Sequence, residues 1–205
     1  MIAIIDYGAG NIRSVSNAIT HLGYQAEISN RAEVIERAQA VVFPGVGAAG
    51  DTMANLKKLG LDKVIKQLVT EKRPLLGICI GLQVFYSGTE EGGWYECLDI
   101  IPGKVKKLPA GLKVPHMGWN QVKQKQNHPI FSGIPDNANF YFVHSYYGTP
   151  QDKSLILAET EYGITFCSGI AKDNLVGVQF HPERSGDMGL QLYENFFKFA
   201  GVNKA

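Results

Sequence analysis

Strand-like runs alternate with helical patterns from Met1 to Ile78, and this alternation restricts the fold more than any other feature of the sequence. The strand candidates are Ile2–Asp6, Gln25–Ser29, Ala40–Phe43 and Pro74–Ile78. Apolar residues at helical spacing occupy the segments between them. Strands that alternate with helices in this way pair in parallel through right-handed crossovers. The first half of the chain is therefore predicted to form an open α/β sheet flanked by helices.

The predicted helices of this half have recognisable ends. Asn11 precedes a helical pattern that stops at Gly23, so these two residues are candidate caps. Asn30 and Glu33 have the spacing of a capping box and predict the start of a short helix. A further helix is indicated by an apolar face made of Val64, Ile65, Leu68 and Val69.

The second half of the chain, between Gly103 and Gly177, follows a different pattern. Turn residues separate short strand candidates and no long helical pattern lies between them, which favours antiparallel pairing. The candidates are Val105–Leu108, Gln121–Lys123, Phe140–His144, Leu155–Glu161 and Thr165–Ile170. The chain is expected to close with a strand at Leu175–Phe180 and a helix at Leu190–Phe199. Because it contains no repeat or linker, residues 1–205 are expected to form one domain.

Charge and cysteine content narrow the range of functions. The 20 basic and 19 acidic residues leave a net charge of +1, so no surface for nucleic acid or an anionic membrane is expected. No stretch approaches the roughly 20 apolar residues of a membrane span, and the N-terminus lacks the cationic segment of a signal peptide. The three cysteines are widely and irregularly spaced, which fits a reducing compartment, and a cytoplasmic protein is predicted.

The sharpest chemical motif is Gly77-Ile-Cys79-Ile-Gly81, which follows a buried strand candidate. A nucleophile between two glycines at a strand-to-helix turn is typical of a nucleophile elbow, here with sulfur in place of a serine oxygen. The helix dipole would favour a thiolate on Cys79, and the Ile80 N–H would face a developing oxyanion. Gln83, on the first helical turn, can reach the same cleft. The alternative is that Cys79 is a small buried hydrophobic residue.

A second motif, His181-Pro-Glu183, follows the strand candidate Leu175–Phe180. A thiolate nucleophile needs a base, and that base needs an orienting carboxylate. Pro182 stiffens the turn, so His181 and Glu183 can face the same side. Taken alone, the pair is a strand-end histidine beside an exposed acid. Cys79 would also lie at the C-terminal end of a parallel strand, where open α/β sheets bind ligands. The two motifs together therefore favour a Cys–His–Glu triad.

A glycine-rich loop, Pro44-Gly45-Val46-Gly47, follows the strand candidate Ala40–Phe43. Such a loop can offer backbone N–H groups to an oxyanion, and its peptide planes reorient at low cost. The Gly45–Val46 peptide is therefore predicted to have two orientations, one of which directs the Val46 N–H into an oxyanion hole. A plain turn is the alternative.

The other motifs are weaker. Asp6-Tyr-Gly-Ala-Gly-Asn11 matches neither the dinucleotide-binding nor the Walker A pattern, so no cofactor is expected. His116 and His144 lie in aromatic segments and are expected to be structural, with His144 better placed to line a cleft. The sequence has no histidine pair at metal-ligand spacing and no CxxC motif, so no metal site is predicted.

Two groups of motifs resemble one protein family. Gly77–Gln83 and His181–Glu183 resemble the active-site motifs of the triad, or class I, glutamine amidotransferases. A narrower resemblance, to the branch of that family that supplies ammonia for histidine biosynthesis, rests on Asp6–Asn11, Pro44–Gly47, Pro115–Asn120 and Phe180–Gly186. The resemblance covers essentially the whole chain. It implies a flavodoxin-like, mostly parallel sheet flanked by helices, an antiparallel portion in the second half, and no cofactor.

The resemblance also implies catalytic roles. In such a glutaminase Cys79 would be the nucleophile, and His181 would be first the base and then the acid. Glu183 would orient His181. The backbone N–H groups of Val46 and Ile80 would form the oxyanion hole.

Substrate and partner contacts follow from the same resemblance. Glutamine would be held by Gly47, Gln83, Ser145 and Tyr146. The released ammonia would pass to a (β/α)₈-barrel synthase subunit, with which the chain would form a heterodimer. Asn11 and Trp119 would lie at the interface between the two subunits.

Two other functions stay open at this point. The chain could be the glutaminase subunit of another amidotransferase, such as that of anthranilate synthase, which would share the triad. It could also be a flavodoxin-like module without enzymatic activity, in which Cys79 senses oxidants. Selective labelling of Cys79 by an electrophilic glutamine analogue would separate an enzyme from a sensor.

Overall fold

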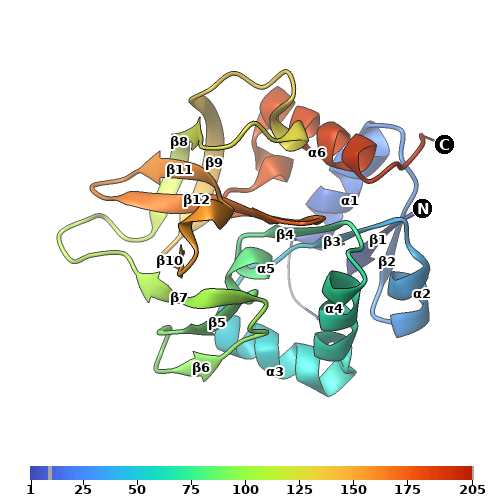
Figure 1. Cartoon of the computed structure of the whole chain (residues 1–205), viewed down its shortest axis with the longest axis horizontal. Coiled ribbons are helices and arrows are strands. Elements are labelled where there is room, and N and C mark those ends of the chain that lie inside the picture. Colours follow the sequence, from blue (N-terminus) through green and yellow to red (C-terminus); the bar gives the residue numbers. More distant parts are fainter. Residues whose placement is uncertain (9–10, 205) are drawn as a thin grey trace.

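A mixed β-sheet forms the centre of the molecule (Figure 1). The computed structural model describes residues 1–8 and 11–204. Within these ranges the sheet has nine strands, in the order β2-β1-β3-β4-β13-β12-β11-β8-β9. The strands from β2 to β13 are parallel neighbours in the order of flavodoxin-like folds. They are β2 (Ala26–Ser29), β1 (Ile2–Ile5), β3 (Ala40–Phe43), β4 (Leu75–Ile78) and β13 (Leu175–Val178).

The rest of this sheet is antiparallel. Its strands are β12 (Thr165–Lys172), β11 (Ile156–Glu161), β8 (His116–Gln124) and β9 (Ala138–His144). The predicted α/β fold, with a parallel part and an antiparallel second half, is therefore confirmed. β8 begins at His116 and not at Gln121 as predicted, because the whole segment pairs with β9.

A second, smaller sheet lies beside the first. Its strands are β10 (Tyr146–Pro150), β7 (Ile101–Lys107), β5 (Tyr86–Thr89) and β6 (Tyr95–Glu96). The sequence predicted only β7, because the other strands are short and lack a run of apolar residues. In β5, Gly88 lies directly against the Trp94 ring, and a Cβ at this position would overlap it.

Helices cover both faces of the parallel strands. Figure 1 shows α1 (Ile12–His21) and α6 (Gly186–Phe199) on one face, with α3 (Ala49–Leu59) and α4 (Leu61–Thr70) on the other. The remaining helical segments are α2 (Ala32–Arg37), α5 (Ile80–Gln83) and the 3-10 turns η1 (Pro129–Phe131), η2 (Lys153–Leu155) and η3 (Pro182–Arg184). The sequence did not predict α3, whose buried face includes small and polar residues. No helix in the described ranges is long and apolar enough to cross a membrane.

Two of the predicted helix caps are wrong. Asn11 does stand at the N-cap of α1, but its side chain caps no helical N–H and is bonded elsewhere. The capping box of Asn30 does not form, because α2 starts at Ala32 with Arg31 at its N-cap. The side chain of Ser29 instead accepts a hydrogen bond from the Arg31 N–H at 3.2 Å. The motif Asp6–Asn11 is described only in part, since Ala9 and Gly10 lie outside the described residues.

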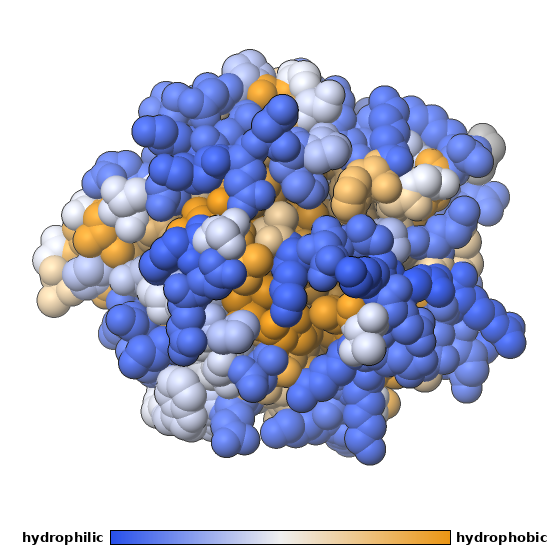
Figure 2. Space-filling view, in the orientation of Figure 1, coloured by the Kyte–Doolittle hydropathy of each residue, from blue (hydrophilic) through white to orange (hydrophobic). Residues whose placement is uncertain are grey.

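The apolar core runs along both faces of the parallel strands. Every residue of β1, β3, β4 and β13 is buried, as expected where helices cover both faces of a sheet. One cluster of buried apolar side chains extends from Ile2 to Val202. Figure 2 shows the outer face in the same view, mostly hydrophilic, with apolar atoms visible in a hollow near its centre.

Close backbone contacts hold the turn after β4. A Cβ at Gly81 would overlap the carbonyl oxygen of Phe43 at the end of β3. A Cβ at Gly77 would overlap the Phe85 ring. The residue between them, Cys79, has φ +55°, a backbone conformation that residues other than glycine rarely adopt. The turn therefore keeps its shape because both flanking positions lack side chains.

We predict that Gly81→Ala destabilises the fold, because a backbone oxygen cannot move aside as a flexible side chain can. The free energy of unfolding should fall by about 1–3 kcal/mol, the usual cost of overpacking, in urea titrations followed by circular dichroism. Gly50→Ala is the matched control: it lies in α3, and its Cβ would meet Tyr95 at an ordinary 3.4 Å. Equal stabilities of the two variants would contradict the prediction.

Candidate active site

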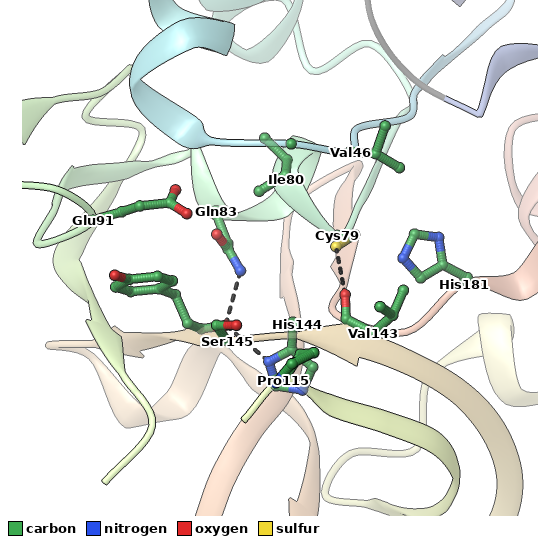
Figure 3. Close-up of a pocket in the computed structure, with 12 residues that line it drawn as sticks. Val46, Cys79, Ile80, Gln83, Glu91, Pro115, Val143, His144, Ser145 and His181 are labelled. Atoms are coloured by element: carbon green, nitrogen blue, oxygen red, sulfur yellow. Dashed lines mark hydrogen bonds between the residues drawn. The ribbon is translucent and has the colours of Figure 1, made fainter. Parts of the chain in front are cut away.

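A cavity of about 300 Å³ lies at the C-terminal ends of the parallel strands. It is lined by residues that follow β3, β4 and β13, and by the segment that joins β9 to β10 (Figure 3). The structure brings together in it the residues expected for chemistry, Cys79, His181, Val46 and Ile80. The residues expected to hold glutamine also line it: Gly47, Gln83, Ser145 and Tyr146.

Cys79 occupies the strained turn between β4 and α5. Its φ of +55° and ψ of −106° are unfavourable for a residue with a side chain, and its N–H donates to the Val178 carbonyl at 2.8 Å. Cys79 is only 3% exposed. The sulfur lies 3.9 Å from the Val143 carbonyl oxygen and 3.5 Å from Gln179 Nε2. The thiol is therefore buried in the wall of the cavity.

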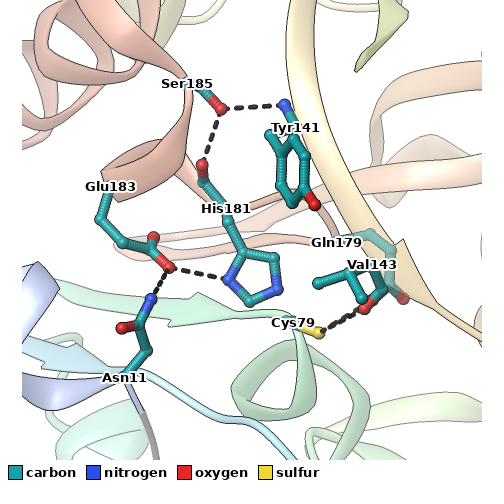
Figure 4. Close-up of polar contacts among 8 residues, drawn as sticks. All are labelled: Asn11, Cys79, Tyr141, Val143, Gln179, His181, Glu183 and Ser185. Carbon is teal, nitrogen blue, oxygen red and sulfur yellow. Dashed lines mark hydrogen bonds and ion pairs between the residues drawn. The ribbon is translucent and has the colours of Figure 1, made fainter. Parts of the chain in front are cut away.

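His181 and Glu183 form a buried pair. Nδ1 of His181 lies 2.7 Å from Oε1 of Glu183, and the two side chains are 2% and 1% exposed. This burial contradicts the alternative of an exposed acid. The same Oε1 accepts a hydrogen bond of 2.8 Å from Asn11 Nδ2 (Figure 4). Asn11 thus binds the carboxylate in place of capping α1.

The turn that carries His181 is attached to β9. The His181 N–H donates to the Tyr141 carbonyl at 2.9 Å. The Ser185 hydroxyl donates to the His181 carbonyl at 2.6 Å and accepts from the Tyr141 N–H at 3.0 Å. Figure 4 shows this bridge above the imidazole. These bonds leave little freedom for the ring to leave the cavity.

The electrostatic surroundings make His181 cationic at neutral pH. Burial alone would lower the pKa of His181, but the neighbouring Cys79 and Glu183 side chains raise it to about 10. Nε2 of His181 is buried and has no hydrogen-bond partner among the described residues. A cationic imidazole beside a thiol is the arrangement of nucleophilic cysteines. The free Nε2 is available to a reacting group in the cavity.

The glycine-rich loop lies directly against the elbow. A Cβ at Gly45 would come within 2.7 Å of the Ile80 Cβ and 2.8 Å of the Gly81 nitrogen. Gly45 is therefore required for close approach, in addition to any role in peptide reorientation. Figure 3 shows Val46 and Ile80 on the same side of Cys79. The predicted pair of oxyanion donors is thus adjacent in space, and the orientation of the Gly45–Val46 peptide stays a prediction.

Three residues at this site were missed by the sequence reasoning. Gln179 is fully buried and contacts the sulfur, and the signal was a polar residue inside an apolar strand. Glu91 lines the cavity, and one of its oxygens accepts from the Ala49 N–H at 2.8 Å. Tyr193 lies beside Glu183; burial and that carboxylate raise the pKa of Tyr193 well above 10. In the sequence it cannot be distinguished from a core aromatic residue of α6.

The two residues expected at a partner interface have different surroundings. Trp119 on β8 is 58% exposed. Its ring packs edge-on against Tyr141, with ring centroids 6.1 Å apart. Asn11 is half-buried beside the triad. Its place in an interface stays a prediction.

The sequence was compared with known proteins. A family described as glutamine amidotransferase class-I matches residues 3–199. The chain belongs to the class I glutamine amidotransferase family. Solved structures agree with this amidotransferase fold: one described as a glutamine amidotransferase has a TM-score of 0.78 at 18% identity, covering 98% of this chain and 100% of that one. PurLQS from Thermotoga maritima also has a TM-score of 0.78, at 14% identity and 97% coverage of both chains.

More similar relatives of this amidotransferase share one name. The imidazole glycerol phosphate synthase subunit HisH of Dehalococcoides mccartyi strain CBDB1 is 56% identical over 200 residues, covering 98% of both chains. The protein of the same name from Moorella thermoacetica is 51% identical over 195 residues, covering 95% of this chain and 93% of its own.

The raised pKa of His181 predicts a specific dependence of stability on pH. A histidine with an unfolded pKa of 6.5 and a folded pKa of about 10 stabilises the fold fully below pH 6.5, and loses that contribution as pH rises to about 10. The stability difference between wild type and His181→Gln should therefore shrink over this range in urea titrations. His128→Gln is the control, because burial lowers the pKa of His128 and leaves it neutral above pH 7. A constant difference for His181→Gln would contradict the prediction.

Proposed function

We propose that this amidotransferase is the glutaminase subunit of an imidazole glycerol phosphate synthase, acting in histidine biosynthesis. It hydrolyses glutamine to glutamate and ammonia and passes the ammonia to a (β/α)₈-barrel synthase subunit in a heterodimer. The observation that carries the proposal is that His181, paired with the buried Glu183, lines one cavity with the strained Cys79. The names of the relatives, at 51–56% identity over nearly the whole chain, support the choice of synthase.

The chemistry of the first half-reaction follows from the charge on His181. The Cys79 thiol gives its proton to His181. The resulting thiolate attacks the side-chain amide carbon of glutamine, and the carbonyl oxygen becomes an oxyanion. The N–H groups of Val46 and Ile80 stabilise this oxyanion. His181 gives its Nε2 proton to the departing nitrogen, so ammonia leaves and a γ-glutamyl thioester remains.

The second half-reaction uses the neutral form of the same imidazole. His181 now takes a proton from water, which attacks the thioester carbonyl carbon. The bond to sulfur breaks, and glutamate is released. Glu183 holds Nδ1 throughout by its 2.7 Å contact and keeps the ring aimed at the sulfur. His181 is thus a base towards the Cys79 thiol, an acid towards the departing ammonia, and a base again towards water.

The polar groups of the cavity fit the amino-acid end of glutamine. Gln83 Oε1 is buried and has no hydrogen-bond partner in the described part of the chain. Together with the Glu91 carboxylate, it offers negative charge and an acceptor to the α-ammonium group. Gly47, Ser145 and Tyr146 line the remainder and are assigned to the α-carboxylate and backbone of the substrate.

The structure weighs against the redox-sensor alternative. Burial raises the pKa of Cys97 to about 11 and that of Cys167 to about 12, so these two thiols are poor nucleophiles at neutral pH. All three cysteines are free thiols, which supports the proposed location in the cytoplasm. Oxidation of a sensor thiol does not require a buried carboxylate such as Glu183 beside His181. An anthranilate synthase subunit would share the triad, but the names of the relatives favour histidine biosynthesis.

We predict that Cys79→Ala lowers the rate at which the complex with the barrel subunit hydrolyses glutamine, by a factor of roughly 10⁴ or more. The same complex should still form product when ammonia is supplied directly, because the partner's reaction does not use the thiol. Glutamate release and product formation would be measured in parallel. Cys97→Ala is the control and should hydrolyse glutamine normally. Hydrolysis that survives in Cys79→Ala would refute the assignment of the nucleophile.

We also predict that Trp119 contributes to binding of the partner. Trp119→Ala should raise the Kd of the heterodimer at least about tenfold, as loss of an aromatic hot spot does, while the Tm of the isolated chain stays unchanged. Titration calorimetry measures the first quantity and thermal unfolding the second. Trp94→Ala is the matched control, since Trp94 is 57% exposed against 58% for Trp119. Similar Kd values for both variants would argue against an interface at Trp119.

A further inference from the structure

Two buried histidines face each other between the cavity and β8. His116 and His144 are directly paired across β8 and β9, and they are 3% and 5% exposed. Nδ1 of His116 lies 2.9 Å from Nε2 of His144. Phe142 and Tyr162 stack on the His116 ring. The described residues include no cluster of three side chains that could hold a metal ion.

The hydrogen-bond direction is determined at the cavity end. Nδ1 of His144 lies 2.8 Å from the Tyr146 carbonyl oxygen. A carbonyl oxygen can only accept, so the hydrogen of His144 is on Nδ1. A neutral His144 then accepts at Nε2, and the hydrogen between the two rings must come from Nδ1 of His116.

The direction is determined independently at the other end. Asn120 Nδ2 lies 2.9 Å from the Glu161 carbonyl oxygen and 3.2 Å from Nε2 of His116. Asn120 Oδ1 accepts from the Gln121 N–H at 2.8 Å, which fixes the orientation of the amide. The two hydrogens of Nδ2 therefore go to Glu161 and to His116. Nε2 of His116 is an acceptor, and its hydrogen is again on Nδ1.

Both ends require the same arrangement, with two neutral rings and every bond pointing from Asn120 to Tyr146. The environment favours the neutral state. Burial lowers the pKa of His116 to about 4 and that of His144 to about 3. For His144, the neighbouring His116 and His181 act in the same direction, against a hydrogen bond to Tyr146. No ring in the chain of bonds carries a charge near neutral pH.

The chain of bonds ends among the residues of the cavity. The Tyr146 carbonyl oxygen also accepts from Gln83 Nε2 at 2.9 Å. That nitrogen donates in addition to Gln179 Oε1 at 3.1 Å, and Gln179 Nε2 contacts the Cys79 sulfur at 3.5 Å. Figure 3 shows His144 and Gln83 directed at this segment. A displacement of His144 would therefore move groups that face the substrate.

We propose that His116 and His144 are neutral positioning residues that hold the Ser145–Tyr146 segment of the cavity in place relative to Asn120. This inference rests on the proposed function in one respect, that the cavity binds glutamine. The hydrogen bonds from Asn120 through His116 and His144 to Tyr146 form a relay. Asn120 follows Trp119 on β8, so this relay joins an exposed aromatic surface to the substrate pocket. It acts on binding of glutamine and not on the nucleophile, because it reaches the sulfur only through Gln83 and Gln179.

The first test reads the relay directly and does not depend on glutamine. In the chain labelled with ¹⁵N, two-bond ¹⁵N–¹H correlations report which imidazole nitrogen carries the hydrogen. We expect the Nδ1–H form for both His116 and His144, with no protonation between about pH 8 and pH 5.5. An Nε2–H form on either ring, or titration near the ordinary value of 6.5, would overturn the proposal whatever the protein's activity.

The second test measures glutamine hydrolysis by the complex at saturating partner. Asn120→Asp removes the donor at nearly constant volume, so KM for glutamine should rise about 3- to 10-fold with kcat changed less than about twofold. Gln121→Glu is the matched control: it adds the same charge on the exposed neighbour, and KM should not change. An active wild type with an unchanged KM in Asn120→Asp would overturn the relay. An inactive wild type would instead count against the proposed function.

A third comparison separates positioning from filling of space. His116→Gln keeps a donor and an acceptor on the side chain, whereas His116→Leu keeps only the volume. KM should stay within about twofold of wild type for the glutamine variant and rise about 3- to 10-fold for the leucine variant. Equal KM values for the two variants would show that the ring only fills the core, and would refute the proposal.

Discussion

The site depends on the close approach of the C-terminal end of β3 to the turn after β4. The Phe43 carbonyl oxygen occupies the place that a side chain at Gly81 would need. Gly45 of the next loop also lies close to Ile80, since a Cβ at this position would come within 2.7 Å of the Ile80 Cβ. Because β4 lies between β3 and β13, the loop with Val46 and the turn with His181 reach the Cys79 elbow from opposite sides. The catalytic geometry therefore follows from strand order once these glycines permit the contact.

Burial of a charged pair is the second constraint, and two helices contribute to it. A buried carboxylate is costly unless it is paired and hydrogen-bonded. Glu183 meets this need with His181 and with the Asn11 side chain, and Tyr193 of α6 lies beside it. Asn11 therefore gives up the helix cap that its position offers. The start of α1 therefore lacks about 1 kcal/mol of stabilisation from a side-chain cap. In return, the Glu183 carboxylate is held in one orientation.

The sequence predicted the features that depend on local pattern. Fully apolar strands such as Ala40–Phe43 are visible because both faces of the parallel part are buried. The elbow is visible because a nucleophile flanked by glycines directly after an apolar strand is itself a local pattern. Strands such as β5 depend on contacts with Trp94 and β7 that no local pattern encodes. Gln179 and Glu91 were missed for a related reason, since only the folded chain brings them to the cavity.

The three buried histidines near the cavity show how neighbours decide the charge of one side-chain type. Burial by itself favours a lower pKa for each of them. Only His181 has a carboxylate and the Cys79 thiol beside it, and there the pKa rises to about 10. For His144, burial is the largest cause and the imidazoles of His116 and His181 add to it, so its pKa falls to about 3 despite the hydrogen bond to the Tyr146 carbonyl. A second cation at His144 would repel the charge on His181 and compete for Cys79. The neutral pair thus allows hydrogen bonds to cross the core without disturbing the single positive charge that the proposed chemistry requires.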